Sequence, residues 1–266
     1  MTSVADSHSG RRDSGEGCDG GPNPRPLAGT GSVADSHSGR RGPGEGCDGG
    51  PDPRRPASVG SVARAYDERA AEYREVAGAL DQMDPRDRAL IRRWRDETPG
   101  RLLDAGCGPG HWTAFLHGDG GVGLGTRHEV EGIDLSAAFI DGARATYPHL
   151  RFHHGSFRTL PHASGTVGGV LAWYSVIHTP PVELPEVLGE FARVLAPGGD
   201  LLLGYFVGEP RVAFAHAVAP AYFWTAEALS PLLAAAGLEL QWSETREREP
   251  GEISSRPHGA LRARRS

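Results

Sequence analysis

A short glycine-rich stretch constrains this chain more than any other feature. Residues 102–110 read Leu-Leu-Asp-Ala-Gly-Cys-Gly-Pro-Gly, and a helix-like pattern begins at His111. An apolar run that ends in an acid, followed by alternating glycines, predicts a strand, a tight turn and a helix N-terminus. Because glycine permits positive φ and lets a ligand approach the backbone, the turn is a candidate ligand site. A strand-to-helix turn without a ligand is the structural alternative.

The glycine spacing distinguishes between classes of ligand. A dinucleotide fingerprint requires Gly-x-Gly-x-x-Gly, and its third glycine would fall at position 111, where this chain has a histidine. The pattern present is Asp104-x-Gly106-x-Gly108-x-Gly110. It resembles the first motif of the class I S-adenosylmethionine (SAM)-dependent methyltransferases.

The first 60 residues differ in composition from the rest of the chain. They contain no Phe, Tyr, Trp or Ile and a single leucine, Leu27. They also carry a tandem duplication, because residues 3–12 recur as 32–41 and residues 15–22 recur as 44–51. Such a segment buries too little apolar surface to offset the entropy of ordering it. We therefore predict a disordered low-complexity tail at 1–60 and one folded domain at 61–266.

Charge and cysteine content limit the expected partners. The formal net charge is −6, whereas a duplex-binding protein usually carries a basic face, so nucleic acid is not expected. No run approaches the roughly 18 apolar residues that span a bilayer, and no signal pattern is seen, so we expect a cytoplasmic protein without a membrane partner. Cys18 and Cys47, two copies of one duplicated position, are expected to be free thiols.

Strand-like and helix-like segments alternate along residues 61–266. Strands are expected at 101–105, 130–134, 150–153, 167–173 and 201–207, with helices at 61–79, 112–116 and 184–195 and after Asp84, Ser136 and Thr225. A loop is expected at 118–125. This order predicts an α/β fold with a doubly wound, mostly parallel seven-stranded sheet, Rossmann-like in type. Two consecutive terminal strands, 238–245 and 257–264, indicate an antiparallel edge hairpin.

The resemblance to class I methyltransferases covers nearly all of residues 66–264, and it is greatest to small bacterial members that act on small molecules. Gly-Ile-Asp-Leu-Ser at 132–136 resembles the second motif of that family. Asp134 would end the second strand, where a carboxylate can accept hydrogen bonds from both ribose hydroxyls. The alternative is an acid that only caps the following helix.

The resemblance implies SAM as the cofactor and a set of binding residues. Ser156 stands where the family commonly has aspartate, and its hydroxyl is a weaker, uncharged acceptor for the adenine. Tyr73 lies on an N-terminal helix that closes over the cofactor in similar enzymes; packing in the core is equally open. The cofactor-binding residues implied are Tyr73, Asp104, Ala105, Gly106, Gly108, Gly110, Asp134, Leu135, Gly155, Ser156, Phe157 and Trp173.

A small-molecule methyl acceptor is expected beside the loop after the fourth strand. Its pocket would be built from Tyr66, Trp173, Tyr174, His178 and the aromatic segment 212–224, which is either a lid or an ordinary packed loop. His178 is the candidate general base, since a neutral imidazole can take a proton from an acceptor; satisfying backbone groups is its alternative role.

No metal site is expected. His153 and His154 are adjacent in a strand and would point to opposite faces, and no cysteine or further histidine is suitably spaced. Three functions remain open from the residues alone: a methyltransferase, a nicotinamide-dependent oxidoreductase, and a SAM-binding protein without turnover.

Overall fold

The computed structural model describes residues 57–118, 128–249 and 256–266. Most of the predicted tail at 1–60 and of the predicted loop at 118–125 therefore lies outside the described residues. The division of the chain at residue 60 stays a prediction, although the first helix already begins at Val59.

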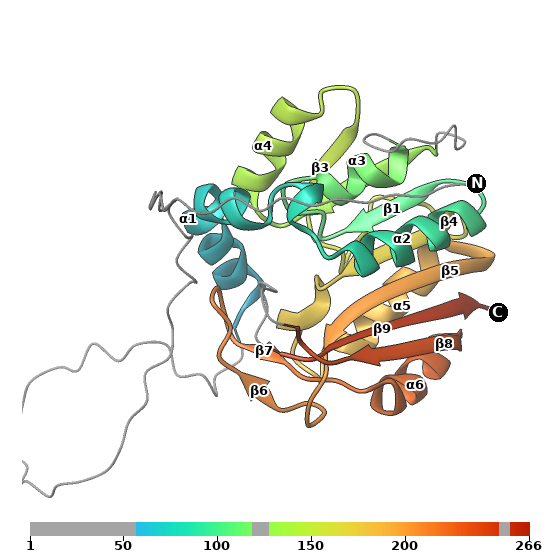
Figure 1. Ribbon diagram of the computed structural model, residues 1–266. Coiled ribbons are helices and arrows are strands. Elements are labelled where there is room, and N and C mark those ends of the chain that lie inside the picture. The colour runs from blue at the N-terminus through green and yellow to red at the C-terminus, as the bar shows by residue number, and fades with distance from the viewer. Residues whose placement is uncertain (1–56, 119–127, 250–255) are drawn as a thin grey trace, which may run out of the picture. The chain divides into compact units, whose positions relative to one another are not determined.

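Seven strands form one sheet in the order β3-β2-β1-β4-β5-β9-β8 (Figure 1). The strands are β1 (Leu102–Ala105), β2 (Val130–Asp134), β3 (Arg151–His154), β4 (Val167–Trp173), β5 (Leu195–Phe206), β8 (Leu238–Arg246) and β9 (His258–Arg265). The first five are parallel, and β9 runs antiparallel between β5 and β8. The predicted fold class and its antiparallel edge are confirmed.

Helices cover both faces of this sheet, as the alternation of strands and helices predicts. They are α1 (Val59–Ala77), α2 (Pro85–Glu97), α3 (His111–His117), α4 (Ala137–Thr146), α5 (Leu184–Val194) and α6 (Ala226–Ala235), with single turns η1 (Leu80–Gln82) and η2 (Val176–His178). Leu102 packs with α2 and α3, whereas Leu103 packs with α5 and α6. Successive strand residues thus belong to opposite core clusters, the signature of a sheet that is buried on both sides.

Polar side chains at the predicted caps explain where several helices begin. The hydroxyl of Ser136 accepts from the amide of Phe139, and that of Thr225 accepts from Ala228. Each satisfies an amide that the first helical turn leaves unpaired. The first helix begins two residues earlier than predicted, because the Ser58 hydroxyl caps it by accepting from the amide of Ser61.

One strand begins earlier than predicted, and one connection between parallel strands carries no helix. Strand β5 begins at Leu195 and not at 201, with Gly198 at φ 75° and a shift in its pairing with β4. Between β3 and β4, residues 155–166 contain no helix. That face of β2 and β3 is therefore covered by a loop where the other parallel connections carry a helix.

No helix in the part of the chain that the structure describes is long and apolar enough to cross a membrane.

Candidate functional site

The predicted site residues converge on one cleft at the carboxyl ends of the parallel strands, beneath α1. Nine of the thirteen line it: Tyr73, Gly106, Gly108, Asp134, Leu135, Ser156, Phe157, Trp173 and His178. The cavity has a volume of about 120 Å³, below the roughly 300–1,000 Å³ of typical small-molecule pockets. Helix α1 contributes Val59, Val62 and Tyr66 to the wall of this cavity.

The glycine turn has the backbone geometry that its sequence predicts. Gly106, Gly108 and Gly110 have φ of 81°, 51° and 87°, conformations that L side chains rarely adopt. A Cβ at Gly106 would lie 2.3 Å from the Cβ of Ser175, and one at Gly110 would lie 2.9 Å from the Phe152 ring. At Gly108, by contrast, no protein atom lies within 4 Å of such a Cβ. Gly108 is therefore the position where a ligand can approach the main chain.

Asp134 joins this turn to the start of α4. Its carboxylate accepts from the amide of Gly108 at 2.9 Å and from the amide of Ser136 at 2.8 Å. Burial raises the pKa of this carboxyl, and the two amides oppose that shift. Asp134 thus supports the start of α4, as the alternative reading expects. Each of its carboxylate oxygens also keeps a lone pair that can accept a hydrogen bond from a hydroxyl in the cleft.

Four of the implied cofactor residues do not line the cavity. Asp104 is buried and accepts from the Thr113 hydroxyl at 2.7 Å, and burial raises its pKa to about 7. Ala105 is fully buried in the core, and Gly110 faces Phe152. Gly155 lies against Ile133. These positions shape the walls of the cleft from behind.

At the opposite end of the cleft, Ser156 begins the turn after β3. Its hydroxyl oxygen accepts from the amide of Arg158 at 3.1 Å, which fixes the side chain at the cleft wall. Phe157 lines the cleft and packs against Phe191 of α5 with ring centroids 5.8 Å apart. Sequence reasoning missed Arg158, which lines the cavity but belongs to no recognisable motif, and Ser175, which lines it from the loop after the fourth strand without having been chosen as a site residue.

His178 lies in η2 and is buried. Its Nδ1 is 2.9 Å from the carbonyl oxygen of Pro220, and its Nε2 is 3.0 Å from the hydroxyl of Tyr66 on α1. Burial lowers the pKa of this imidazole, so the ring is neutral at neutral pH. Both predicted roles are therefore compatible with its geometry: one ring nitrogen satisfies a backbone carbonyl, and the other faces a phenol.

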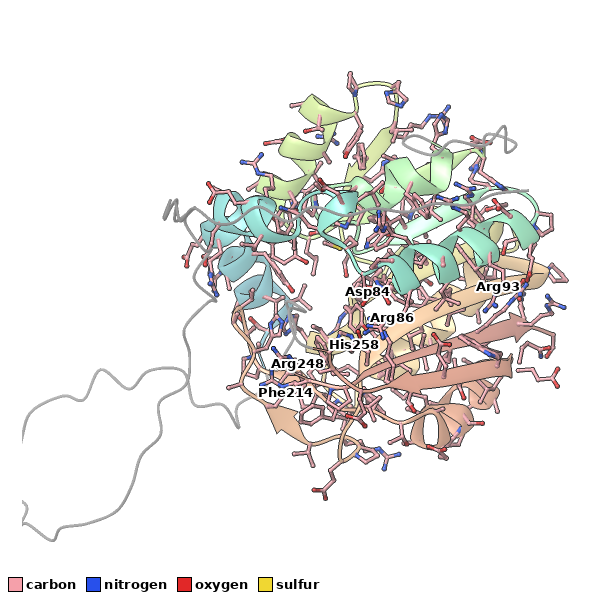
Figure 2. The ribbon with its side chains drawn as sticks, viewed as in Figure 1. Asp84, Arg86, Arg93, Phe214, Arg248 and His258 are labelled. Atoms are coloured by element: carbon pink, nitrogen blue, oxygen red, sulfur yellow. The ribbon has the colours of Figure 1, made fainter. Side chains whose placement is uncertain are left out.

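The aromatic segment 212–224 folds into a small ribbon of β6 (Ala213–Phe214) and β7 (Ala221–Tyr222) beside η2. Phe206 of β5 contacts Phe214 and His258, with centroid distances of 5.7 and 5.8 Å. Phe214 and His258 are labelled in Figure 2. His216 lies 5.0 Å from the His178 ring, and burial lowers its pKa to about 3. The rings around His178 are therefore neutral at neutral pH.

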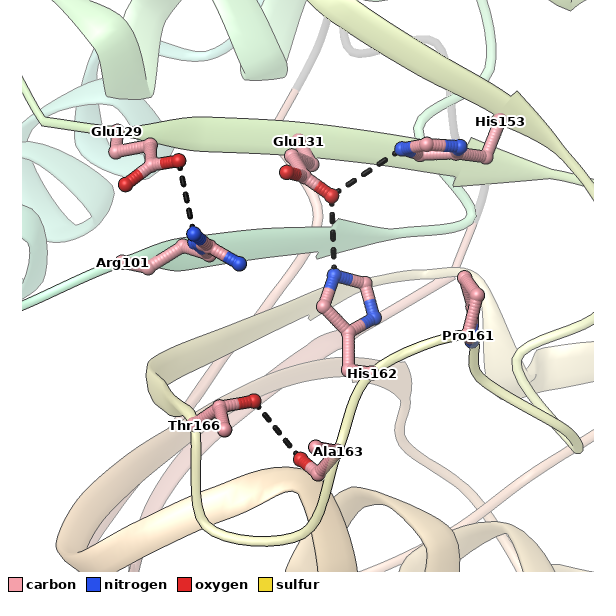
Figure 3. A pocket seen from close by; sticks show the side chains of 8 residues that line it. All are labelled: Arg101, Glu129, Glu131, His153, Pro161, His162, Ala163 and Thr166. Carbon is pink, nitrogen blue, oxygen red and sulfur yellow. Dashed lines mark hydrogen bonds and ion pairs between the residues drawn. The ribbon is translucent and has the colours of Figure 1, made fainter.

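A second hollow of about 590 Å³ lies on the sheet face that residues 155–166 leave without a helix (Figure 3). There Glu131 of β2 is 3.2 Å from Nε2 of His153 and 3.1 Å from Nε2 of His162. None of the predicted site residues lines this hollow. Across residues 57–118, 128–249 and 256–266, no group of three His, Cys, Asp or Glu side chains is arranged to hold a metal ion.

The topology, the glycine turn and the acid after β2 together define an α/β protein with a cleft at the tips of its parallel strands, the place where ligands gather in open α/β sheets. Residues 102–199 match the family model described as a methyltransferase domain. This part of the chain is therefore similar to the methyltransferase domain family, and it includes the glycine turn and the acid after β2.

Curated relatives match over part of the chain. Malonyl-[acyl-carrier protein] O-methyltransferase of Pectobacterium atrosepticum is 31% identical over 131 residues, 48% of either chain. Trans-aconitate 2-methyltransferase of Methylobacterium radiotolerans is 32% identical over 151 residues, 54% of either chain. The chain thus spans about half the length of the curated relatives it matches.

Solved structures share the fold over a longer part of this chain than the curated relatives match. The crystal structure of the [4+2]-cyclase SpnF aligns with a TM-score of 0.65 at 19% identity, covering 79% of this chain and 97% of that one. The 1,6-didemethyltoxoflavin-N1-methyltransferase of Burkholderia thailandensis, with bound S-adenosylhomocysteine, aligns at 0.60 and 21% identity, covering 79% and 91%. Likeness at this level of identity shows the fold alone.

Proposed function

We propose that this protein transfers a methyl group from SAM to a small-molecule acceptor. The observation that carries the proposal is the position of Asp134, whose carboxylate is held by the amides of Gly108 and Ser136 at the wall of the cleft. A carboxylate held in this way can accept both ribose hydroxyls of a nucleoside. The curated relatives are methyltransferases by name, which supports methyl transfer over the nicotinamide alternative.

Different residues of the cleft would contact different parts of the cofactor. The nucleoside would lie against the main chain on the open side of Gly108. Asp134 would hold its ribose. Ser156 and Phe157 would border the adenine, and Tyr73 would hydrogen-bond the methionine carboxylate from α1. Burial raises the pKa of Tyr73 to about 12, which keeps it a hydrogen-bond donor. Asp104, Ala105, Gly110 and Gly155 would act through the shape of the turns.

When bound, SAM supplies an electrophilic methyl carbon on a sulfonium with an already activated leaving group. The protein's main task is then alignment, which can contribute about 7–11 kcal/mol in favourable cases. Trp173, Tyr174 and the ring cluster around His178 would hold the acceptor at the strand tips. These residues and the cover provided by α1 would also exclude water from the reacting atoms.

The decisive experiment incubates the protein with methyl-labelled SAM and a cell extract and identifies the metabolite that gains label. In parallel, calorimetry measures S-adenosylhomocysteine binding to the wild type, to Asp134→Asn and to the exposed control Asp141→Asn. We expect a labelled small molecule, and an affinity loss confined to Asp134→Asn. Tight binding without any labelled product would favour a SAM-binding protein without turnover. Unchanged affinity in Asp134→Asn would refute the ribose assignment.

A further inference from the structure

Two hydrogen bonds fix the proton positions on His178. A backbone carbonyl can only accept, so the 2.9 Å contact with the oxygen of Pro220 requires a proton on Nδ1. In the neutral imidazole Nε2 then carries a lone pair, and the Tyr66 hydroxyl at 3.0 Å donates to it. Tyr66 is thus aimed at a base and not at a second donor.

The surroundings of this pair decide which group can hold a charge. Burial is the largest cause that raises the pKa of Tyr66 well above its usual value, with Tyr73 and Asp134 adding to it. A free tyrosinate is therefore strongly disfavoured, and Tyr66 cannot act as a base that waits in its ionised form. It can accept a proton only while it gives its own proton to His178.

We propose that Tyr66 and His178 form a proton relay, and that the methyl acceptor is an O–H or N–H compound protonated at neutral pH and not a carboxylate. This inference rests on the proposed function. The acceptor's O–H or N–H bond breaks as its lone pair forms the bond to the methyl carbon. Its proton passes to the Tyr66 oxygen while the Tyr66 proton passes to Nε2 of His178. The product is a neutral methylated acceptor, a neutral phenol and an imidazolium.

Charge balance favours this sequence in a buried cleft. The methyl donor loses its positive charge as His178 gains one, so the number of buried charges does not change. The new imidazolium keeps its hydrogen bond to the carbonyl oxygen of Pro220. His178 can hold the proton only briefly, because burial lowers its pKa, and it is free to act again once the proton is lost.

The acceptor class follows from the need for this relay. Carboxylic acids are ionised at neutral pH and require no base, whereas hydroxyls and amines keep a proton that must leave when the methyl group arrives. Neutral rings surround the relay, with Phe139 at 5.7 Å from the Tyr66 ring and His216 at 5.0 Å from the His178 ring. Arginines are also present, because Arg158 lines the cleft and the charges of Arg256 and Arg69 act on His216. The acceptor class therefore follows from the proton that must leave and not from the charge of the surroundings.

The relay is tested with Tyr66→Phe, which keeps the ring and removes the hydroxyl, and with His178→Asn. Tyr147→Phe, at the end of α4 and not among the residues that line the cleft, is the matched control. Nitrogen NMR of the protein saturated with S-adenosylhomocysteine should show His178 protonated at Nδ1 and unprotonated at Nε2. With the acceptor found by labelling, Tyr66→Phe should lower kcat by about 10²-fold or more with little change in KM. Tyr147→Phe should match the wild type.

A purely structural contact between α1 and η2 gives a different pattern. Tyr66→Phe would then lower thermal stability or raise KM, and kcat would stay within threefold of the wild type. That result overturns the relay, as does a His178 protonated at Nε2 or a labelled product that is a carboxylic ester. If the wild type forms no labelled product at all, the proposed methyl transfer itself fails. If Tyr66→Phe forms the product as fast as the wild type, only the relay fails.

Discussion

The Asp67 carboxylate of α1 accepts hydrogen bonds from the hydroxyl of Ser136 at 2.6 Å and from the amide of Ala138 at 3.1 Å. One helix thereby caps the N-terminus of another, since Ser136 and Ala138 stand at the start of α4. Ser136 also donates its amide to Asp134. Ser136 therefore connects α1, which lines the cleft, with Asp134 on the cleft wall.

Asp67→Ala should loosen this cover. Loss of a capping acceptor costs about 0.5–2 kcal/mol, which lowers Tm by roughly 1–8 °C for a domain of this size. Because α1 lines the cleft, looser packing of α1 on α4 should also let S-adenosylhomocysteine dissociate several-fold faster. Stopped-flow fluorescence and thermal shift measure the two effects.

The control for this prediction is Glu68→Ala, an exposed neighbour on the same helix. It should leave both the dissociation rate and Tm near the wild-type values. If Asp67→Ala and Glu68→Ala release the ligand at the same rate, the contact between α1 and α4 does not hold the cover in place.

The three glycines of the turn should respond differently to the same substitution. Gly108→Ala meets no protein atom within 4 Å, so it should fold with a loss of about 1–2 kcal/mol from its left-handed backbone. Its methyl group would point into the space where a nucleoside approaches the main chain. We expect S-adenosylhomocysteine affinity to fall at least tenfold, measured by calorimetry.

Gly106→Ala is the matched comparison. Its Cβ would lie 2.3 Å from the Cβ of Ser175, so it should destabilise the fold clearly more than Gly108→Ala. Equal melting temperatures for the two variants, or an unchanged affinity in Gly108→Ala, would contradict the assignment of Gly108 to the ligand side of the turn.

Local sequence signals located much of this fold and part of its site. The caps at Ser136 and Thr225, strand β4 and the antiparallel edge all follow from residues that are close in sequence. The contact of Tyr66 with His178 spans 112 positions, and no local pattern encodes it. The hollow beside Glu131 depends on the connection between β3 and β4, which carries no helix, so His153 and His162 both reach Glu131 only through the tertiary fold.

Asp104 should make stability depend on pH. Burial raises the pKa of its carboxyl to about 7, above the ordinary value of 3.8. Between about pH 4 and 7 the folded state therefore binds more protons than the unfolded state, and stability falls as the pH rises. The shift corresponds to a loss of the order of 4 kcal/mol once the pH exceeds 7.

The variant Asp104→Asn keeps an acceptor for the Thr113 hydroxyl and removes the ionisation. Its free energy of unfolding relative to the wild type should rise steadily from pH 4 to 7, as measured by urea denaturation at several pH values. Asp141→Asn, at an exposed position of α4, should give a flat difference. A flat difference for Asp104→Asn as well would show that this carboxyl titrates normally in the fold.

His111, which follows the glycine turn as the first residue of α3, should have the opposite effect. It is 4% exposed, and neither ring nitrogen has a hydrogen-bond partner among the described residues. Burial lowers its pKa to about 4 from the ordinary value of 6.5. The unfolded state therefore binds more protons between pH 6.5 and 4, and stability is lost as the pH falls through this range.

Replacing this ring by an apolar side chain removes both the buried polar atoms and the titration. His111→Leu should stabilise the protein by about 1–3 kcal/mol at pH 7, since two unsatisfied nitrogens disappear. At pH 5 the stabilisation by His111→Leu should be about 2 kcal/mol larger than at pH 7. The wild type is then roughly 1.5 pH units below the ordinary histidine pKa, and each unit costs it about 1.36 kcal/mol of stability. Urea denaturation at pH 5 and 7 measures both. If His111→Leu is less stable than the wild type at pH 7, the imidazole has a partner that the leucine cannot replace. If the gain in stability is equal at both pH values, His111 titrates as it does in solvent.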